Sequence, residues 1–261
     1  MGIADSIRFY LASQYLAWKT AISYRFSFVL WLIYSTFSEI YAVIAITVIY
    51  TVSSGIAGWS YYQMLLLSAA ATMVLGAIYY HIESRMVVNK MRNGGYDGLF
   101  SKPYGLVTIM LSTSGGTTEI SGFVSGLLVF AYSAIKLRLP LESVLVYLAV
   151  FGIGTFALLL FVLMLTALTY LLFKSSSFMN NFLGFLSTAA SYPINIYGPV
   201  FSLLFTVVVP IGIATYYPAG MIFGKISPGA IAIVIVLSVL VGTISYKLFY
   251  AIMKHYSSGG G

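Results

Sequence analysis

Two acidic side chains stand in long apolar runs of the sequence, at Glu39 and Glu119. An acid near the middle of a bilayer costs at least about 2.5 kcal/mol on insertion scales, so it is usually paired, protonated or functional. The run around Glu119, STSGGTTEISGF, is small and polar and suits the wall of a cavity. Each acid therefore either lines a path through the protein or ties helices together by hydrogen bonds.

Other reactive groups are scarce. The chain has no Cys, which excludes disulfides, thiolate metal sites and a Cys nucleophile. His81 and His255 are far apart and have no acidic cluster beside them, so we expect no metal site. No G-x-S-x-G motif is present. The string AGMIFGKIS at 219–227 lacks the leading Gly and the hydroxyl residue of a nucleotide-binding loop. We expect no catalytic and no nucleotide-binding site in this chain.

The composition indicates that lipid surrounds these residues. Of the 261 residues, 60% are hydrophobic and 7% are charged, whereas a soluble domain carries roughly 25% charged residues. Thirteen Lys and Arg outnumber six Asp and Glu. The basic residues lie in short gaps between apolar runs, which fits membrane topology and not a nucleic-acid surface. The expected surroundings are a lipid bilayer, with no nucleic-acid partner.

The elements that position the acids are apolar helices, because a spanning helix needs about 20 mostly apolar residues. The sequence predicts six spans: Phe26–Thr51, Tyr61–Tyr80, Leu106–Ile135, Val144–Phe173, Phe182–Ala214 and Pro228–Tyr250. Strand alternation is missing. The prediction is an all-α membrane protein with one domain over 1–256. Residues 257–261, reading SSGGG, resemble a linker or a tag remnant.

An amphipathic helix is predicted before the first span, within residues 1–25. Its apolar side chains recur at helical spacing at Ile7, Leu11, Tyr15, Trp18 and Ile22. Trp and Tyr suit the membrane interface. The alternative is a cytosolic helix that packs on a loop.

The orientation follows from the Lys and Arg residues, which concentrate in cytoplasmic loops. With a cytoplasmic N-terminus, ten of the thirteen lie inside, and only Lys136, Arg138 and Lys225 lie outside. We therefore expect a multi-pass protein of the plasma membrane with both termini in the cytoplasm.

The longest polar stretch, 81–105, is cytoplasmic on this topology. It extends the second span until Asn93-Gly94-Gly95 stops the helix, since Gly tolerates the left-handed conformation of a helix end. Residues 96–101 suit a short second helix that Pro103 prevents from continuing. Such a helix across the inner face is a docking element for a soluble partner, or else a solvated loop between two helices.

The fifth segment is rich in proline. Four of the seven prolines lie there, at Pro193, Pro199, Pro210 and Pro218. Each removes a backbone donor, and such breaks persist in a membrane where they face protein or water. We expect a kinked span followed by a short outer helix or re-entrant turn around Tyr216–Gly224.

Two stretches resemble a known family. GGYDGLFSKPYG (94–105) resembles the signature after the second span in permeases of ABC-type exporters, although Tyr96 stands where the family often has Leu. YPINIYGPVFSLLFTVVVPIGIATYYPA (192–219) resembles the fifth span and outer loop of the same type 2 (export) family. Six spans, an amphipathic N-terminal helix and cytoplasmic termini also agree, so the resemblance covers essentially the whole chain.

The resemblance implies a permease that pairs with an identical or sister permease and binds two ABC ATPase subunits, which hold the ATP and Mg. It implies no cofactor in this chain. The few ionisable groups and many aromatic residues suit a hydrophobic or amphipathic cargo, although the aromatic residues are equally suited to anchoring at the membrane interface. The implied ATPase-coupling residues are Arg92, Gly94, Gly95, Tyr96, Asp97, Leu99, Phe100, Lys102 and Pro103, with Asp97 capping or salt-bridging the segment. The implied outer gate is the kinked region with Pro193, Pro199, Pro210 and Pro218, and Glu39 and Glu119 are the candidate pathway residues from the argument on intramembrane acids above.

The alternative is a secondary, proton-coupled carrier that uses Glu39 and Glu119 as proton sites. No inverted repeat relates the two halves, as many such carriers require. Dependence on a partner distinguishes an ABC permease from a secondary carrier, because a carrier moves cargo alone. An anchoring protein without transport is a third class, and it leaves the broken spans unexplained.

Overall fold

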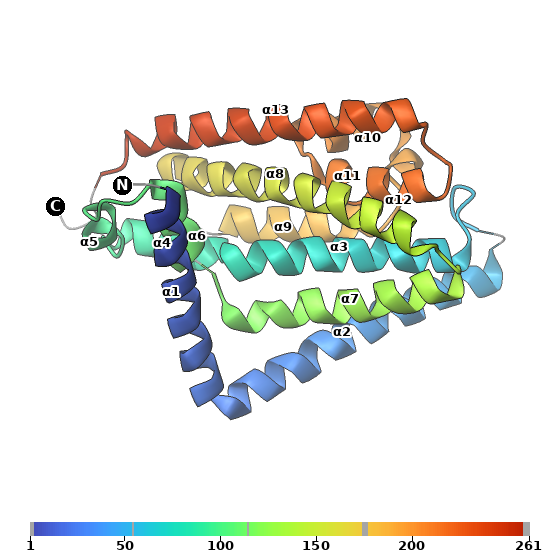
Figure 1. Ribbon diagram of the computed structural model, residues 1–261, viewed down its shortest axis with the longest axis horizontal. Coiled ribbons are helices and arrows are strands. Elements are labelled where there is room, and N and C mark those ends of the chain that lie inside the picture. The colour runs from blue at the N-terminus through green and yellow to red at the C-terminus, as the bar shows by residue number, and fades with distance from the viewer. Residues whose placement is uncertain (1–2, 54, 114, 174–176, 258–261) are drawn as a thin grey trace.

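The computed structural model describes residues 3–53, 55–113, 115–173 and 177–257. These residues form helices and turns, with one isolated bridge between Ile56 and Trp59 and no strand among them. The all-α prediction is confirmed. Six long helices run along the molecule (Figure 1): α2 (Arg25–Val52), α3 (Tyr61–His81), α7 (Ile120–Lys136), α8 (Leu141–Phe173), α9 (Ser177–Ala190) and α13 (Pro228–Met253).

The short elements gather toward the two ends of the bundle. The end that holds both termini has α4 (Ser84–Arg92), α5 (Asp97–Phe100), α6 (Leu106–Thr113) and the turn η1 (Thr117–Glu119). The opposite half has η2 (Ile194–Tyr197), α10 (Gly198–Leu203), the π-helical turn η3 (Leu204–Val208), α11 (Ile211–Ala214) and α12 (Tyr216–Ile222). Helix α1 (Ile3–Ser23) lies across the bundle axis at the first end (Figure 1).

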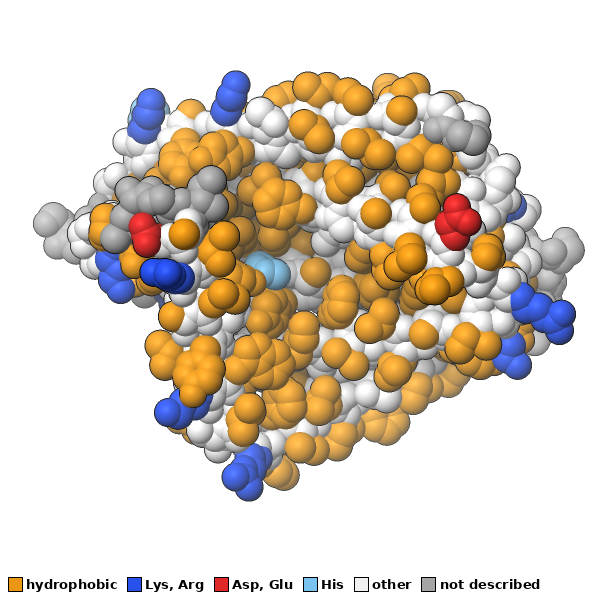
Figure 2. Space-filling model, in the orientation of Figure 1, with side chains coloured by type: hydrophobic (Ala, Val, Ile, Leu, Met, Phe, Trp, Pro, Cys, Tyr) orange, Lys and Arg blue, Asp and Glu red, His pale blue; other side chains and the backbone are white. Residues whose placement is uncertain are grey.

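The helices are long and apolar enough for a multi-pass membrane protein. Four segments of the described chain qualify as spans: α2, α3 with α4 (61–92), α8 and residues 229–253 of α13. The bent pair formed by α9 and residues 194–208 brings the number to five, and α7 is apolar but has only 17 residues. Lys and Arg side chains gather at the two ends, and apolar surface lies between them (Figure 2).

The predicted third span, Leu106–Ile135, is divided in the structure. Helix α6 ends at Thr113, and α7 begins at Ile120 after η1. Gly115 lies directly against the end of α3, where an added Cβ would overlap the Tyr80 carbonyl. The amide of Gly116 also donates to the Tyr79 carbonyl at 3.4 Å. The tight approach to α3 interrupts the helix.

The proline-rich segment breaks more sharply than the predicted kink, because α9 and residues 194–208 meet at 108°. Each proline lies at the start of a helical piece, where its missing N–H has no partner to lose. Pro193 and Pro210 directly precede η2 and α11. Pro199 and Pro218 lie in the first turns of α10 and α12. The expected short helix near 216–224 is α12.

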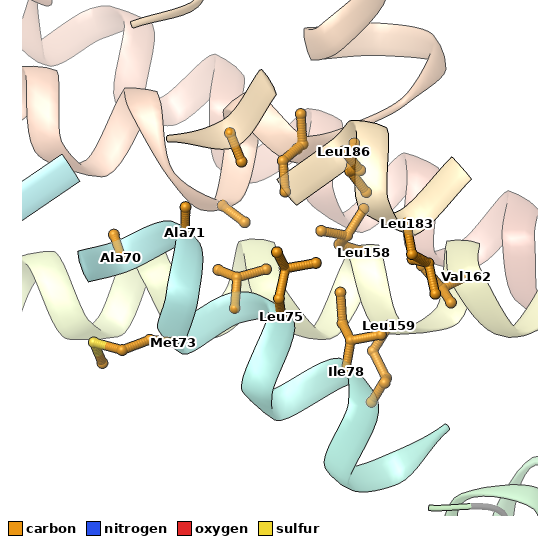
Figure 3. Close-up of a cluster of buried hydrophobic side chains, with 14 of the residues drawn as sticks. Ala70, Ala71, Met73, Leu75, Ile78, Leu158, Leu159, Val162, Leu183 and Leu186 are labelled. Atoms are coloured by element: carbon orange, nitrogen blue, oxygen red, sulfur yellow. The ribbon is translucent and has the colours of Figure 1, made fainter. Parts of the chain in front are cut away.

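Helix α3 forms the core. Its side chains Ala70, Ala71, Leu75 and Ile78 interdigitate with Leu158, Leu159 and Val162 of α8 and with Leu183 and Leu186 of α9 (Figure 3). On another face, small residues bring α3 and α7 into backbone contact. A Cβ on Gly76 would overlap the Phe123 backbone, and a Cβ on Gly126 would lie 2.9 Å from the Ala69 oxygen. Gly122 and Gly126 form a G-x-x-x-G step, a spacing that lets helices approach closely, and both lie against α3.

Two helices turn their apolar side chains outward. Helix α2 diverges from the bundle (Figure 1), and most of its large apolar side chains are exposed. On α1 the exposed residues include Ile7, Leu11, Tyr15 and Ile22, most of the predicted apolar face. Its inner face holds Tyr10, Gln14 and Trp18 against the end of α3. Helix α1 thus attaches to the bundle with an apolar face free, as an interfacial helix does.

The contact between α3 and α7 can be tested with Gly126→Ala. The added methyl would lie 2.9 Å from Ala69 O and 3.0 Å from Met73 N, so the helices must separate. We expect a loss of about 1–3 kcal/mol of stability, seen as a lower thermal unfolding midpoint in detergent.

Gly152→Ala is the matched control, because no atom lies within 4 Å of its added Cβ in the middle of α8. Alanine stabilises a helix interior relative to glycine by roughly 0.5–1 kcal/mol. Equal midpoints for the two variants would contradict the close packing of α3 and α7.

Candidate coupling segment and membrane cavity

The 92–103 segment begins where α4 ends. Gly94 has φ +69°, in the left-handed region that glycine tolerates, and the Gly95 amide donates to the Lys90 carbonyl at 2.8 Å. Helix α5 follows at once and ends before Pro103. The helix stop at 93–95 and the short helix after it lie where the sequence predicted them.

One face of this segment is anchored and the other is open. Tyr96 is fully buried, and Leu99 and Phe100 are half-buried. The other face is exposed, at Arg92, Gly95, Gly98, Lys102 and Pro103. A soluble partner can therefore reach a surface that the protein already holds in place.

Tyr256, three residues past the end of α13, anchors the segment. Its hydroxyl donates to Asp97 Oδ1 at 2.8 Å and lies 3.3 Å from the Met91 carbonyl oxygen. Asp97 is thus tied to the C-terminal end of the chain. The predicted capping or salt-bridging role of Asp97 remains a prediction, since the tyrosine is a different partner. Sequence reasoning missed Tyr256 because 159 residues separate the pair.

An aromatic cluster surrounds this hydrogen bond. The Tyr96 and Phe100 rings stack at 5.3 Å, and the Tyr256 ring lies 5.3 Å from Phe100 and 5.6 Å from Tyr170 of α8. Burial, followed by the hydrogen bond to the Asp97 carboxylate, raises the pKa of Tyr256 above its ordinary value. The hydroxyl therefore stays a neutral donor at physiological pH.

Helix α1 braces the other side of the segment. Phe9 of α1 stacks on Tyr104 at 4.2 Å, and Lys102 Nζ lies 5.7 Å from the Phe9 ring centroid. Farther along α1, Trp18 Nε1 donates to the Tyr80 hydroxyl at 3.0 Å. That hydroxyl donates to Gln14 Oε1 at 2.6 Å. A movement of the segment would therefore also move α1.

Glu39 and Glu119 face one cavity of about 420 Å³, walled by α2, α3, the start of α7 and α9. Hydroxyl groups dominate its polar lining: Ser35, Ser38, Ser68, Thr72, Ser121, Ser125, Ser187 and Ser191. Glu39 is only 5% exposed, and Thr72 of α3 lines the same cavity. Glu119 is half-buried. The structure thus brings together two acids that lie far apart in the sequence.

None of the four prolines is among the residues that line this cavity, although Ser191, which does line it, is two residues from Pro193. Pro193, Pro210 and Pro218 are buried, and Pro199 is exposed. Helix α12, which contains Pro218, packs against the loop that precedes α3. Trp59 of that loop is buried against Tyr216 and Phe223, with ring centroids 5.8 and 5.7 Å away. Lys225 Nζ donates to the Gly58 carbonyl at 2.7 Å.

The described part of the chain contains no candidate metal site. Within the described ranges, no group of three or more His, Asp and Glu side chains is arranged to hold an ion.

Comparison with protein families gives a match over residues 36–260, to the family described as ABC-2 family transporter protein. The chain belongs to this family. Comparisons with curated proteins and with solved structures found no match.

Membership in the ABC-2 family confirms the resemblance that the two sequence motifs indicated. A member is a multi-pass permease subunit of an ABC transporter. In this family the permease is a transport subunit that works with an ATPase subunit, and the nucleotide-binding domain belongs to that partner. The matched range includes both cavity acids, the 92–103 segment and Tyr256.

The anchoring of this segment can be tested with Tyr256→Phe. The change removes the hydroxyl that donates to Asp97 and keeps the ring against Phe100 and Tyr170. We expect faster amide hydrogen exchange over residues 92–103, by a factor of about ten or more, because one hydrogen bond to a charged acceptor contributes about 1.5–3 kcal/mol.

Tyr15→Phe is the control, since Tyr15 is largely exposed on α1. Unchanged exchange in Tyr256→Phe, or an equal change in both variants, would show that the hydroxyl does not hold the segment.

Proposed function

We propose that this permease is half of the translocation pathway of an ATP-driven ABC exporter for a hydrophobic or amphipathic cargo. Two separate ATPase subunits bind ATP and Mg, and residues 92–103 couple them to the membrane helices. A second permease, identical or sister, supplies the other half of the path. The single observation that carries the proposal is the 92–103 segment, anchored on one face and exposed on the other.

The proposed topology has six crossings in the plasma membrane, with both termini in the cytoplasm. The crossings are α2, α3 with α4, α6 with α7, α8, α9 with α10, and α13. Both termini and the 92–103 segment lie at one end of the bundle (Figure 1), which supports an even number of crossings. Lys136, Arg138 and Lys225 belong to the turns of the opposite half. The positive-inside rule then places the first end in the cytoplasm.

The contacts of the segment support a mechanical role. Residues 92–103 follow α4, which continues the line of α3, and α3 forms a wall of the cavity. Tyr256 and Tyr170 tie the same segment to the ends of α13 and α8. Closure of the ATPase subunits would push on the exposed face, and these helices would carry the displacement to the cavity. Transport then needs two helix packings of similar energy.

The proline-broken pieces supply the proposed outer gate. Residues 194–222 form several short helical pieces, four of which have a proline at or near their start, and α12 rests on the loop around Trp59 at the outer end. We place α11 and α12 as a re-entrant segment that enters from outside and turns back. Backbone groups freed by the breaks would face protein or the path, as a membrane requires.

The runner-up is a proton-coupled carrier, and the cavity with two carboxyl groups is the observation that favours it. Such a carrier would move cargo without ATP. Family membership supports the ATP-driven account, because an ABC permease acts with an ATPase subunit.

Replacement of residues 92–103 by a Gly/Ser linker of equal length tests the coupling role. The complex would be purified in mild detergent from the native host. We expect a stoichiometric ATPase to accompany the unchanged permease and to be lost, by at least tenfold, from the linker variant, because the docking surface is gone.

The control replaces residues 136–140 by Gly/Ser, since this exposed turn lies at the opposite end of the bundle. Loss of the ATPase only from the first variant supports the proposal. Retention of the ATPase by the linker variant would overturn the coupling role, and transport by the permease alone would favour the carrier.

A further inference from the structure

The polar cavity has a charge imbalance that the proposed function does not use. Glu39 and Glu119 line it, and no Lys, Arg or His is among the described residues that do so. Helix α2 carries Glu39 in the middle of an apolar span. An ionised carboxylate in such surroundings is strongly destabilised unless a positive charge or a set of donors compensates it. The described lining offers hydroxyl donors and no positive charge.

Aromatic rings occupy the same cavity. Trp31, Tyr34 and Tyr41 of α2 and Tyr79 of α3 line it. Tyr34 and Tyr41 are 65% and 75% exposed, so these two stand at the mouth. The Trp31 and Tyr34 rings meet edge to face at 5.6 Å. Aromatic faces attract cations, most strongly where water is scarce, and they also accept apolar groups.

The position of the cavity decides what can enter it. It lies between the two charged ends of the bundle, and it opens beside α2, which carries many exposed apolar side chains. A ligand reaching it from the bilayer must therefore be largely apolar. An anion would find no basic side chain to compensate its charge, whereas a cation would stabilise the ionised form of the two acids.

We propose that this cavity is a binding site for lipophilic organic cations, which narrows the cargo of the proposed exporter to positively charged amphiphiles. The inference rests on the proposed function only in placing the cavity on the transport path. Glu39, buried on α2 against Thr72, supplies one charge. Glu119, at the start of α7, supplies the other. The aromatic rings of α2 hold the apolar part of the ligand.

Helix α2 links binding to movement in this arrangement. It contributes Glu39 and three of the four rings, yet it packs loosely and diverges from the bundle (Figure 1). A cation held between Glu39 and Glu119 would draw α2 toward α3 and α7. Binding of the cargo would therefore bring the walls of the site together.

A matched pair of ions tests the proposal. Tetraphenylphosphonium and tetraphenylborate have the same shape and opposite charge. Binding of each radiolabelled ion would be measured on the full-length permease in detergent, without the ATPase. We expect the phosphonium to bind at least tenfold more tightly than the borate. Equal affinities, or tighter binding of the borate, would overturn the proposal.

Four variants assign the effect to the cavity. Glu39→Gln and Glu119→Gln should each weaken phosphonium binding at least tenfold, and Glu39→Asp and Glu119→Asp should retain most of it. Glu142→Gln is the matched control, because Glu142 lies exposed at the start of α8 and outside the cavity. Thermal unfolding identifies any variant that fails to fold. At such a position, phosphonium binding by the Asp variant is measured in place of binding by the Gln variant. Wild-type affinity in both Gln variants would refute the site.

A separate measurement tests the proposed ATP-driven function. ATP hydrolysis by the co-purified complex would be measured with and without the phosphonium. Binding and stimulated hydrolysis support both proposals. Binding without stimulation keeps the cation site and removes it from the ATP-driven path. Selective stimulation is expected to disappear in Glu39→Gln. Loss of the ATPase partner does not affect the binding assay, so the two failures are distinguishable.

Discussion

The rest of the structure depends on the backbone contact between α3 and α7. Gly76 and Gly126 have no room for a Cβ, and Ala69 to Ala71 keep that part of α3 small. This contact draws α3 into the core, where α8 and α9 cover its other faces (Figure 3). Because α3 is held on several sides and continues into α4, a displacement at residues 92–103 cannot stay local. Without such packing, the segment would move independently of the cavity.

Helix α3 also positions polar residues of the cavity and the contact with α1. Its residues Ser68, Thr72 and Tyr79 line the cavity, and Tyr80 at its end binds α1. The two acids come from helices on either side, so the cavity exists only while α2 and α7 are placed against α3. Helix α2 is the least enclosed of these walls, and it is therefore the wall that can move at the lowest energetic cost. The short helices α11 and α12, which follow Pro210 and contain Pro218, lie in the opposite half of the molecule.

Hydropathy was enough to predict α3, α8 and α13, since long apolar runs in lipid form helices. Spacing predicted α1, and glycine chemistry predicted the helix end at Gly94. The break after Thr113 could not be predicted, because it arises from contact with Tyr80 of another helix. Likewise, the prolines predicted a kink, but they could not predict the 108° bend between α9 and residues 194–208. The Tyr256–Asp97 pair and the shared cavity of Glu39 and Glu119 join distant residues, which one sequence does not reveal.

The central claim is that the ATPase changes the cavity through residues 92–103. The chain has no Cys, so Ser187→Cys places a single thiol in the cavity wall on α9. Its rate of modification by a small water-soluble thiol reagent would be measured in the purified complex, with and without trapped ATP. The account predicts that the rate changes at least severalfold on ATP binding, and that the Gly/Ser linker at 92–103 abolishes this difference. Equal rates in both nucleotide states of the intact complex would contradict it.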